Sequence, residues 1–282
     1  MARKGLDFDT KLGYFGFYVV VVLLLVYSFT PAIWLVLTSL KETQQIIRLP
    51  IEFFPDPLTF KQYGEAFQRA PFAVFIMNSV IVSLCSMALT VFIATLASYA
   101  LARLRVKHKQ FWLTAFLLIS TYPLIALMVP LFKTFRELGL LNTYPALILP
   151  YSVFSMPISI WILTTFFRTI PSDLEDAALI DGCSRIGSLV RVIFPMSAPG
   201  VATASMISFV NSWNEFTLAF SLMSDEEKYT LPVGVTLLRD QFTIPWGLIS
   251  AGVTITIIPL VLLIVFYQKS LISGLTAGSV KG

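Results

Sequence analysis

The chain has 282 residues, of which 56% are hydrophobic and only 13% are charged. Soluble globular domains carry about 25% charged residues, so this composition argues against a soluble enzyme and against a disordered protein. Two cysteines are too few to staple a chain of this length, which argues against a disulfide scaffold. The remaining class is a protein that crosses a membrane several times.

Six stretches of at least 23 residues contain no Asp, Glu, Lys or Arg. A spanning helix needs about 20 predominantly apolar residues, so each stretch is long enough to cross once. Lipid offers the backbone no hydrogen-bond partners, so the spans are expected to be helices. Continuous apolar runs such as Val19–Val26 exclude the alternating strands of a barrel. The sequence predicts an all-α membrane protein with a single domain over residues 1–282 and six spans, at 13–40, 72–101, 110–132, 145–167, 199–222 and 246–268.

Six spans place both termini on one side of the membrane. When that side is the cytoplasm, the inner segments hold 12 basic and 6 acidic residues, whereas the outer segments hold 8 basic and 9 acidic residues. The basic cluster Arg103–Lys109 then lies inside, as the positive-inside rule requires. This topology explains the net charge of +4, and no nucleic-acid-binding surface is indicated.

The long inner segment 168–198, between the fourth and fifth spans, has the pattern of two short helices. Ser172 or Asp173 can cap the first helix, and Gly182 can end it in a left-handed conformation. A second short helix is expected to stop at Pro195. Such a helix–turn–helix is suited to docking a partner, and an ordinary amphipathic loop fits the same pattern.

The same segment carries a known family pattern. Asp176-Ala177-Ala178-x3-Gly182-x9-Val192-x-Phe194-Pro195 resembles the EAA loop of permease subunits of ABC importers, E-A-A-x3-G-x9-I-x-L-P. Asp replaces Glu, Val replaces Ile and Phe replaces Leu, and Glu175 could share the acidic position. Trp213-Asn214-Glu215-Phe216 and the ending Gly274–Gly282 narrow the resemblance to the carbohydrate-uptake branch, and there to its smaller six-span permease, as in maltose and trehalose importers.

The resemblance implies a permease subunit of an ATP-binding-cassette sugar importer in the cytoplasmic membrane of a bacterium or archaeon. Its implied partners are a homologous permease, two ATP-binding subunits, an extracytoplasmic sugar-binding protein and the membrane lipid. The chain itself is then no enzyme and holds no metal or cofactor, because ATP and Mg are bound by the partner subunit. The implied contact with that subunit lies at Glu175, Asp176, Ala177, Ala178, Asp181, Gly182 and Pro195. The expected substrate is an α-linked disaccharide such as trehalose or maltose, with a monosaccharide, a polyol or glycerol phosphate left open.

A polar group in the fifth span is the candidate substrate pathway. Asn211, Asn214 and Glu215 are spaced i, i+3 and i+4, so one helix would place them on one face. Amide and carboxylate groups suit sugar hydroxyls, and Trp213 or Tyr151 could stack on a pyranose ring. Glu215 could instead be a hydrogen-bond anchor between helices or subunits, because it is the one charge within a span.

Two other classes remain open from the residues alone. An ion-coupled secondary transporter would need no ATP, and a membrane scaffold would carry no sugar. The chain has no G-x-x-x-x-G-K-[ST] phosphate loop, and its single intramembrane charge is fewer than ion-driven pumps usually need. Prolines in the third and fourth spans are expected to bend them and to free carbonyls that face either protein or a wet pathway: Pro123, Pro130, Pro150 and Pro157. These spans are expected to line the pathway, and a purely structural bend fits each single proline equally well.

Overall fold

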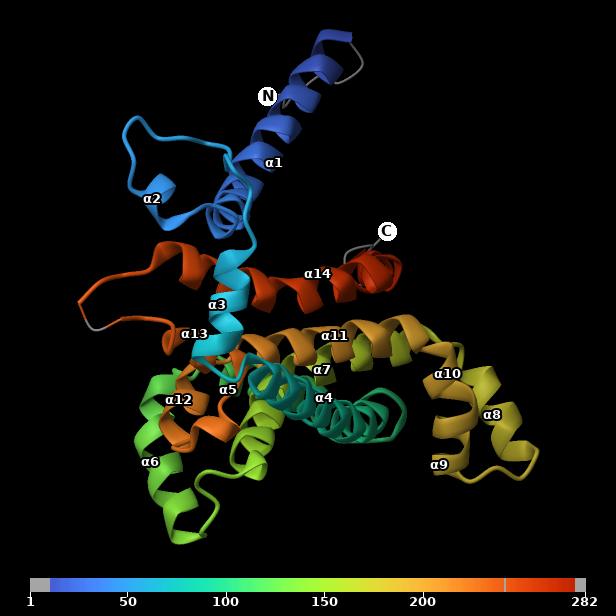
Figure 1. The fold of residues 1–282 in the computed structure, drawn as a ribbon. Helices are drawn as coiled ribbons and strands as arrows, with labels where there is room; N and C mark the ends of the chain where they lie inside the picture. Colours follow the sequence, from blue (N-terminus) through green and yellow to red (C-terminus); the bar gives the residue numbers. More distant parts are fainter. Residues whose placement is uncertain (1–10, 241, 277–282) are drawn as a thin grey trace. The chain divides into compact units, whose positions relative to one another are not determined.

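The computed structural model describes residues 11–240 and 242–276 (Figure 1), and within them the chain is helical and forms no strand. The helices are α1 (Lys11–Ser39), α2 (Thr43–Ile46), α3 (Lys61–Arg69), α4 (Phe72–Arg103), α5 (Lys109–Ser120), α6 (Leu124–Glu137), α7 (Tyr144–Thr169), α8 (Ser172–Ile180), α9 (Arg185–Ser188), α10 (Phe194–Met196), α11 (Ala198–Asn214), α12 (Thr217–Leu222), α13 (Leu231–Thr236) and α14 (Trp246–Thr276). A π-helical turn, η1 (Leu189–Ile193), joins α9 to α10, and a 3-10 turn, η2 (Glu226–Lys228), follows α12. The predicted all-α class is confirmed for these residues.

The described chain forms two compact units. Unit 1 contains residues 11–70 and 238–255, and unit 2 contains residues 71–237 and 256–276. The division passes through α14, whose first part belongs to unit 1. The single domain over residues 1–282 that the sequence indicates stays a prediction.

Among the residues that the structure describes, four helices are long and apolar enough to cross a membrane: Tyr14–Ser39, Phe72–Arg103, Tyr144–Thr169 and Trp246–Gln268. They agree within a few residues with the first, second, fourth and sixth predicted spans. The number rises to six when each of two bent helix pairs counts as one span. The cytoplasmic placement of both termini stays a prediction, and most of the motif at 274–282 lies outside the described residues.

The third predicted span, 110–132, is not one straight helix. α5 and α6 are bent by 85° at a short break. Pro123 precedes α6 in an extended conformation, and proline cannot donate the hydrogen bond that would continue α5. The predicted bend therefore occurs at Pro123, whereas Pro130 lies inside α6, and Pro150 and Pro157 lie inside an uninterrupted α7.

The fifth predicted span, 199–222, is also interrupted. α11 has 17 residues and so extends about 25 Å. It ends at Asn214, the backbone of Glu215 is extended, and α12 starts only at Thr217. The prediction of one helix running through Glu215 is therefore wrong. At its other end α11 is bent by 83° from the helical segment Arg185–Met196.

Hydroxyl groups join α4 to α7 in unit 2. Ser98 Oγ donates to the carbonyl of Ile160 at 3.0 Å. Thr90 Oγ1 donates to the carbonyl of Ser152 at 3.3 Å, and Ser152 Oγ donates to the carbonyl of Ser86 at 3.2 Å. Small side chains allow spanning helices to approach closely in lipid. Because α11 packs on both helices (Figure 1), these three helices form the framework that positions the candidate sites.

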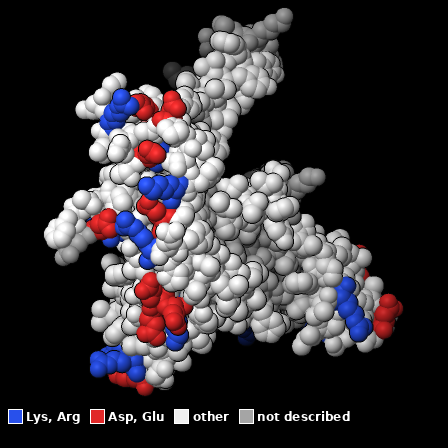
Figure 2. Space-filling model, viewed as in Figure 1, with Lys and Arg blue, Asp and Glu red and all other residues white. Residues whose placement is uncertain are grey.

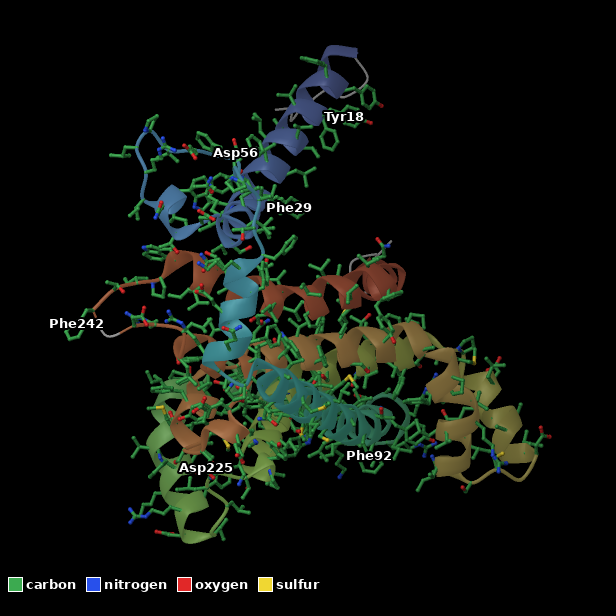
Figure 3. All side chains as sticks on the ribbon, in the orientation of Figure 1. Tyr18, Phe29, Asp56, Phe92, Asp225 and Phe242 are labelled. Atoms are coloured by element: carbon green, nitrogen blue, oxygen red, sulfur yellow. The ribbon has the colours of Figure 1, made fainter. Side chains whose placement is uncertain are left out.

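Unit 1 contains the exposed apolar helix α1, whose end contacts α3 through polar side chains. Along α1, apolar side chains such as Tyr18 and Phe29 project away from the helix (Figure 3) and are more than half exposed. At the end of α1, Ser39 Oγ lies 2.7 Å from the hydroxyl of Tyr63 in α3. The exposed length of α1 is what a helix covered by lipid or by a partner span would show.

Candidate functional site

α8 is the helix that the sequence assigns to docking. It begins at Ser172 directly after Pro171, and no side chain caps it, so the predicted cap by Ser172 or Asp173 is wrong. The reason is that Ser172 is already helical, while the capping position is held by a proline without a side-chain acceptor. Asp173 and Glu175 do lie in the first turn, where the helix dipole favours acidic side chains.

The end of α8 follows the sequence prediction closely. Gly182 has a φ of 87°, in the left-handed region that glycine adopts without a steric penalty. Its N–H donates to the carbonyl of Leu179 at 3.1 Å, and the N–H of Cys183 donates to the carbonyl of Ala178 at 2.9 Å. These two bonds form a Schellman motif, so Gly182 fixes the direction in which the chain leaves α8.

The second helix is longer and less regular than predicted. The hydroxyl of Ser184 caps it by accepting from the N–H of Gly187 at 3.1 Å. The chain stays helical through the π turn η1 and through α10, so Pro195 lies inside the helical segment and does not stop it. Proline lacks the N–H for an ordinary turn and clashes with the preceding carbonyl. The π turn η1 contains Arg191, four residues before Pro195, so the irregular turn lies where that conflict would arise.

We call α8, α9, η1 and α10 together the 172–196 segment. Some of the residues predicted to contact the ATP-binding subunit are exposed on this segment, and others are buried. Exposed side chains or backbone occur at Asp176, Ala177, Asp181, Gly182 and Pro195, whereas Glu175 and Ala178 are buried. Large apolar side chains are exposed beside them at Leu174, Ile180, Ile186, Val190 and Met196. In Figure 2 the surface of this segment carries acidic and basic patches next to uncharged surface. Exposed apolar side chains that adjoin such charges are typical of an interaction surface.

Glu175 points into unit 2 and not toward solvent. Its carboxylate accepts a hydrogen bond from the hydroxyl of Tyr99 and lies 3.6 Å from Nε of Arg103. Arg103 also donates to the carbonyl of Ile170, at 2.6 Å. The sequence reasoning missed this cluster because it interpreted Arg103 only as a topology signal, although Arg103 is the one basic residue in the last turn of α4.

Glu215 caps the start of α12. Its carboxylate accepts from the N–H of Leu218 at 2.9 Å and from the N–H of Ala219 at 3.2 Å. The hydroxyl of Tyr151 donates to the same carboxylate at 2.6 Å. A negative charge at a helix N-terminus is favoured by the backbone dipoles. This arrangement agrees with the interpretation of Glu215 as an anchor between helices, since Tyr151 belongs to α7.

A small cavity with both polar and apolar lining residues lies beside this cap. Its volume is about 210 Å³, and its lining residues are Ser120, Tyr122, Leu124, Tyr151, Phe154, Ser155, Asn211, Ser212 and Glu215. The structure thus brings Tyr151, Asn211 and Glu215 together, as the pathway hypothesis requires, while Asn214 does not line the cavity. Ser120 and Tyr122 were missed because the sequence predicts a bend at Pro123 but does not show which side chains that bend brings to α7 and α11.

Trp213 is a core residue. It is 1% exposed, its ring stacks on Phe209 with 5.6 Å between ring centroids, and its indole Nε1 donates to the carbonyl of Thr256 at 3.2 Å. The hypothesis that Trp213 stacks on a sugar is therefore wrong, since no face of the ring is free. Among the residues that the structure describes, no group of three or more His, Cys, Asp or Glu could hold a metal ion.

Residues 90–276 match the protein family described as binding-protein-dependent transport system inner membrane component. The chain is 48% identical to the sulfoquinovosyl glycerol transport system permease protein of Agrobacterium fabrum, over 92% of this chain and 91% of that protein. It is 37% identical to the trehalose transport system permease protein of Mycobacterium tuberculosis, over 91% and 93% of the two chains. It is 35% identical to the trehalose/maltose transport system permease protein of Thermococcus litoralis, over 93% and 94%.

The fold is also similar to solved structures. A chain of a bacterial ABC transporter involved in the import of the acidic polysaccharide alginate aligns with a TM-score of 0.78 at 20% identity, over 92% of this chain and 98% of that chain. A chain from the alginate ABC transporter in complex with an alginate pentasaccharide-bound periplasmic protein aligns with a TM-score of 0.65 at 16% identity, over 94% and 96%.

Proposed function

The chain belongs to the family of binding-protein-dependent transport system inner membrane components, and we propose that it forms half of the translocation pathway of an ABC importer for a glycoside. The carbohydrate-uptake branch of sugar permeases is the part of the family to which its relatives belong. The proposed assembly contains a homologous permease, two ATP-binding subunits and an extracytoplasmic binding protein. Both termini and the 172–196 segment are proposed to face the cytoplasm, following the charge distribution.

The observation that carries the proposal is the surface of the 172–196 segment. Asp176 and Asp181 are exposed on α8 and at its end, and Ile180 beside them is 85% exposed. Exposed apolar side chains at a helix end need a partner to remove them from water. The proposed partner is the ATP-binding subunit, with the turn at Gly182 holding α8 and α9 at a fixed angle.

The cavity of about 210 Å³ beside Glu215 is proposed to be part of the substrate pathway. Asn211 is exposed there and offers an amide to sugar hydroxyls. Glu215 and Tyr151 are already hydrogen-bonded to each other, so we propose that they stabilise the wall of the cavity and do not bind the sugar. Asn214 is exposed but outside the cavity, and its part in the pathway rests on the sequence alone.

Sulfoquinovosyl glycerol is the first substrate to test, because the relative that carries this name is 48% identical to the chain. Trehalose and maltose, which the sequence favours, come second through relatives at 37% and 35% identity. All are small glycosides, and this shared chemistry is the substrate class that we propose.

The experiment is a substrate panel in liposomes. The chain is reconstituted with its partner permease, its ATP-binding subunits and its binding protein, and uptake is measured for sulfoquinovosyl glycerol, trehalose, maltose and a free hexose. We expect ATP-dependent uptake of one glycoside and little uptake of the hexose. Uptake of the hexose alone would refute the substrate class and leave the permease assignment standing.

A further inference from the structure

The Tyr99–Arg103–Glu175 cluster joins helices that lie far apart in the sequence. Glu175 of α8 is 7% exposed, and its Oε1 accepts from the hydroxyl of Tyr99 in α4 at 2.5 Å. Its Oε2 lies 3.6 Å from Nε of Arg103, one helical turn further along α4. A second nitrogen of Arg103 donates to the carbonyl of Ile170, just after α7, at 2.6 Å. One buried cluster thus links the ends of α4 and α7 to α8.

Apolar side chains exclude water from this cluster. Tyr99 packs in a buried group with Phe167, Leu189 and Ile193, which come from α7 and η1. In a water-poor environment charged hydrogen bonds are strong, and removing one partner leaves a costly buried charge. α8 therefore has no low-energy way to slide along α4 while the cluster holds. The other acids on α8, Asp173 and Asp176, are exposed and cannot replace Glu175 in this contact.

We propose that this cluster is the joint through which displacement of α8 is transmitted to α4, so that Tyr99, Arg103 and Glu175 are positioning residues for the coupling of ATP hydrolysis to transport. This inference rests on the proposed function, because it requires that an ATP-binding subunit moves α8. The pair also has room to tighten: Nε of Arg103 is buried and has no hydrogen-bond partner, and a small approach of α8 to α4 would bring Glu175 within bonding distance.

The test uses the complete reconstituted transporter and measures the number of sugar molecules imported per ATP hydrolysed. Tyr99→Phe keeps the ring and removes the hydroxyl that holds Glu175. The double variant Arg103→Met with Glu175→Met removes both charges together, which is often tolerated where a single unpaired charge is not. Glu137→Gln is the control, since it neutralises an exposed acid of unit 2 that lies outside the 172–196 segment.

We expect Tyr99→Phe and the double variant to assemble with the ATP-binding subunits and to hydrolyse ATP, while the imported sugar per ATP falls at least about fivefold, the lower range of allosteric coupling. The control should keep the wild-type ratio. A purely structural role would lower the amount of assembled complex and leave the ratio unchanged.

A wild-type ratio in either assembled variant overturns the proposal. If the double variant fails to assemble, the ratio of imported sugar to hydrolysed ATP in Tyr99→Phe alone tests the proposal, because this variant leaves the ion pair in place. A wild-type transporter that imports no glycoside with ATP would instead refute the proposed function, so the two failures are distinguishable.

Discussion

Glu215→Gln tests the role that the structure gives to the carboxylate. The carboxylate accepts three hydrogen bonds, from Leu218 N–H, Ala219 N–H and the Tyr151 hydroxyl. An amide has one oxygen, so glutamine can keep at most two of them and turns an NH₂ group toward the third donor. A hydrogen bond to a charged group contributes about 1.5–3 kcal/mol. The loss of charge at the start of α12 adds about 0.3–1 kcal/mol.

Neutralising the side chain also removes the cost of holding a charge at membrane depth. That gain offsets part of the loss, so the net destabilisation should be about 2 kcal/mol. For a domain of this size the expected fall in melting temperature is about 4–8 °C. The assay is thermal unfolding of the purified complex, followed by uptake at a temperature where both proteins are folded. The apparent affinity for sugar should be unchanged.

Tyr151→Phe is the matched control, because it removes one of the three bonds and leaves the charge. It should give a smaller fall in melting temperature in the same assay. A Glu215→Gln complex with wild-type stability and a clearly weaker sugar affinity would refute the capping role and restore direct substrate contact as the explanation.

Three further substitutions probe other parts of the account. Gly182→Val should abolish uptake while the chain still inserts in the membrane. A residue with a side chain in the left-handed conformation costs about 1–2 kcal/mol or more, and the turn after α8 would change. As a control, Gly64→Ala should transport normally, because Gly64 lies in α3 with open space around it. Ile180→Asp should reduce recovery of the ATP-binding subunit in affinity purification about tenfold or more, whereas Ile47→Asp, similarly exposed but outside that surface, should have no effect. Trp213→Ala should lower stability by about 3–5 kcal/mol and leave the substrate preference unchanged in an uptake panel.

Four of the six predicted spans are single long helices within the described residues; these and the turn at Gly182 could be predicted because their causes are local. Long stretches without charge admit few structures other than membrane helices. A glycine directly after the last turn of a helix commonly ends that helix in a left-handed conformation. The same local logic predicted the bend at Pro123 but not its angle of 85°. That angle depends on how α5 packs against α7 and α6 against α12, which a single sequence does not encode in a short window.

The interruption at Glu215 could not be predicted, because neither glycine nor proline marks it. The helix ends there since the carboxylate can satisfy the first N–H groups of α12, with Tyr151 from a distant part of the chain as a third partner. Likewise, Glu175 and Asp176 are adjacent acids, yet one is buried and the other exposed. Only the position of Tyr99 and Arg103 on α4 separates their roles.

The energy source of uptake tests the central claim most directly. Liposomes that contain the complete assembly are loaded with ATP, and accumulation of the preferred glycoside is measured with and without an ionophore that collapses ion gradients. The account predicts accumulation that requires ATP and survives the ionophore, with no accumulation by this chain alone. Accumulation by the lone chain driven by an ion gradient would contradict it.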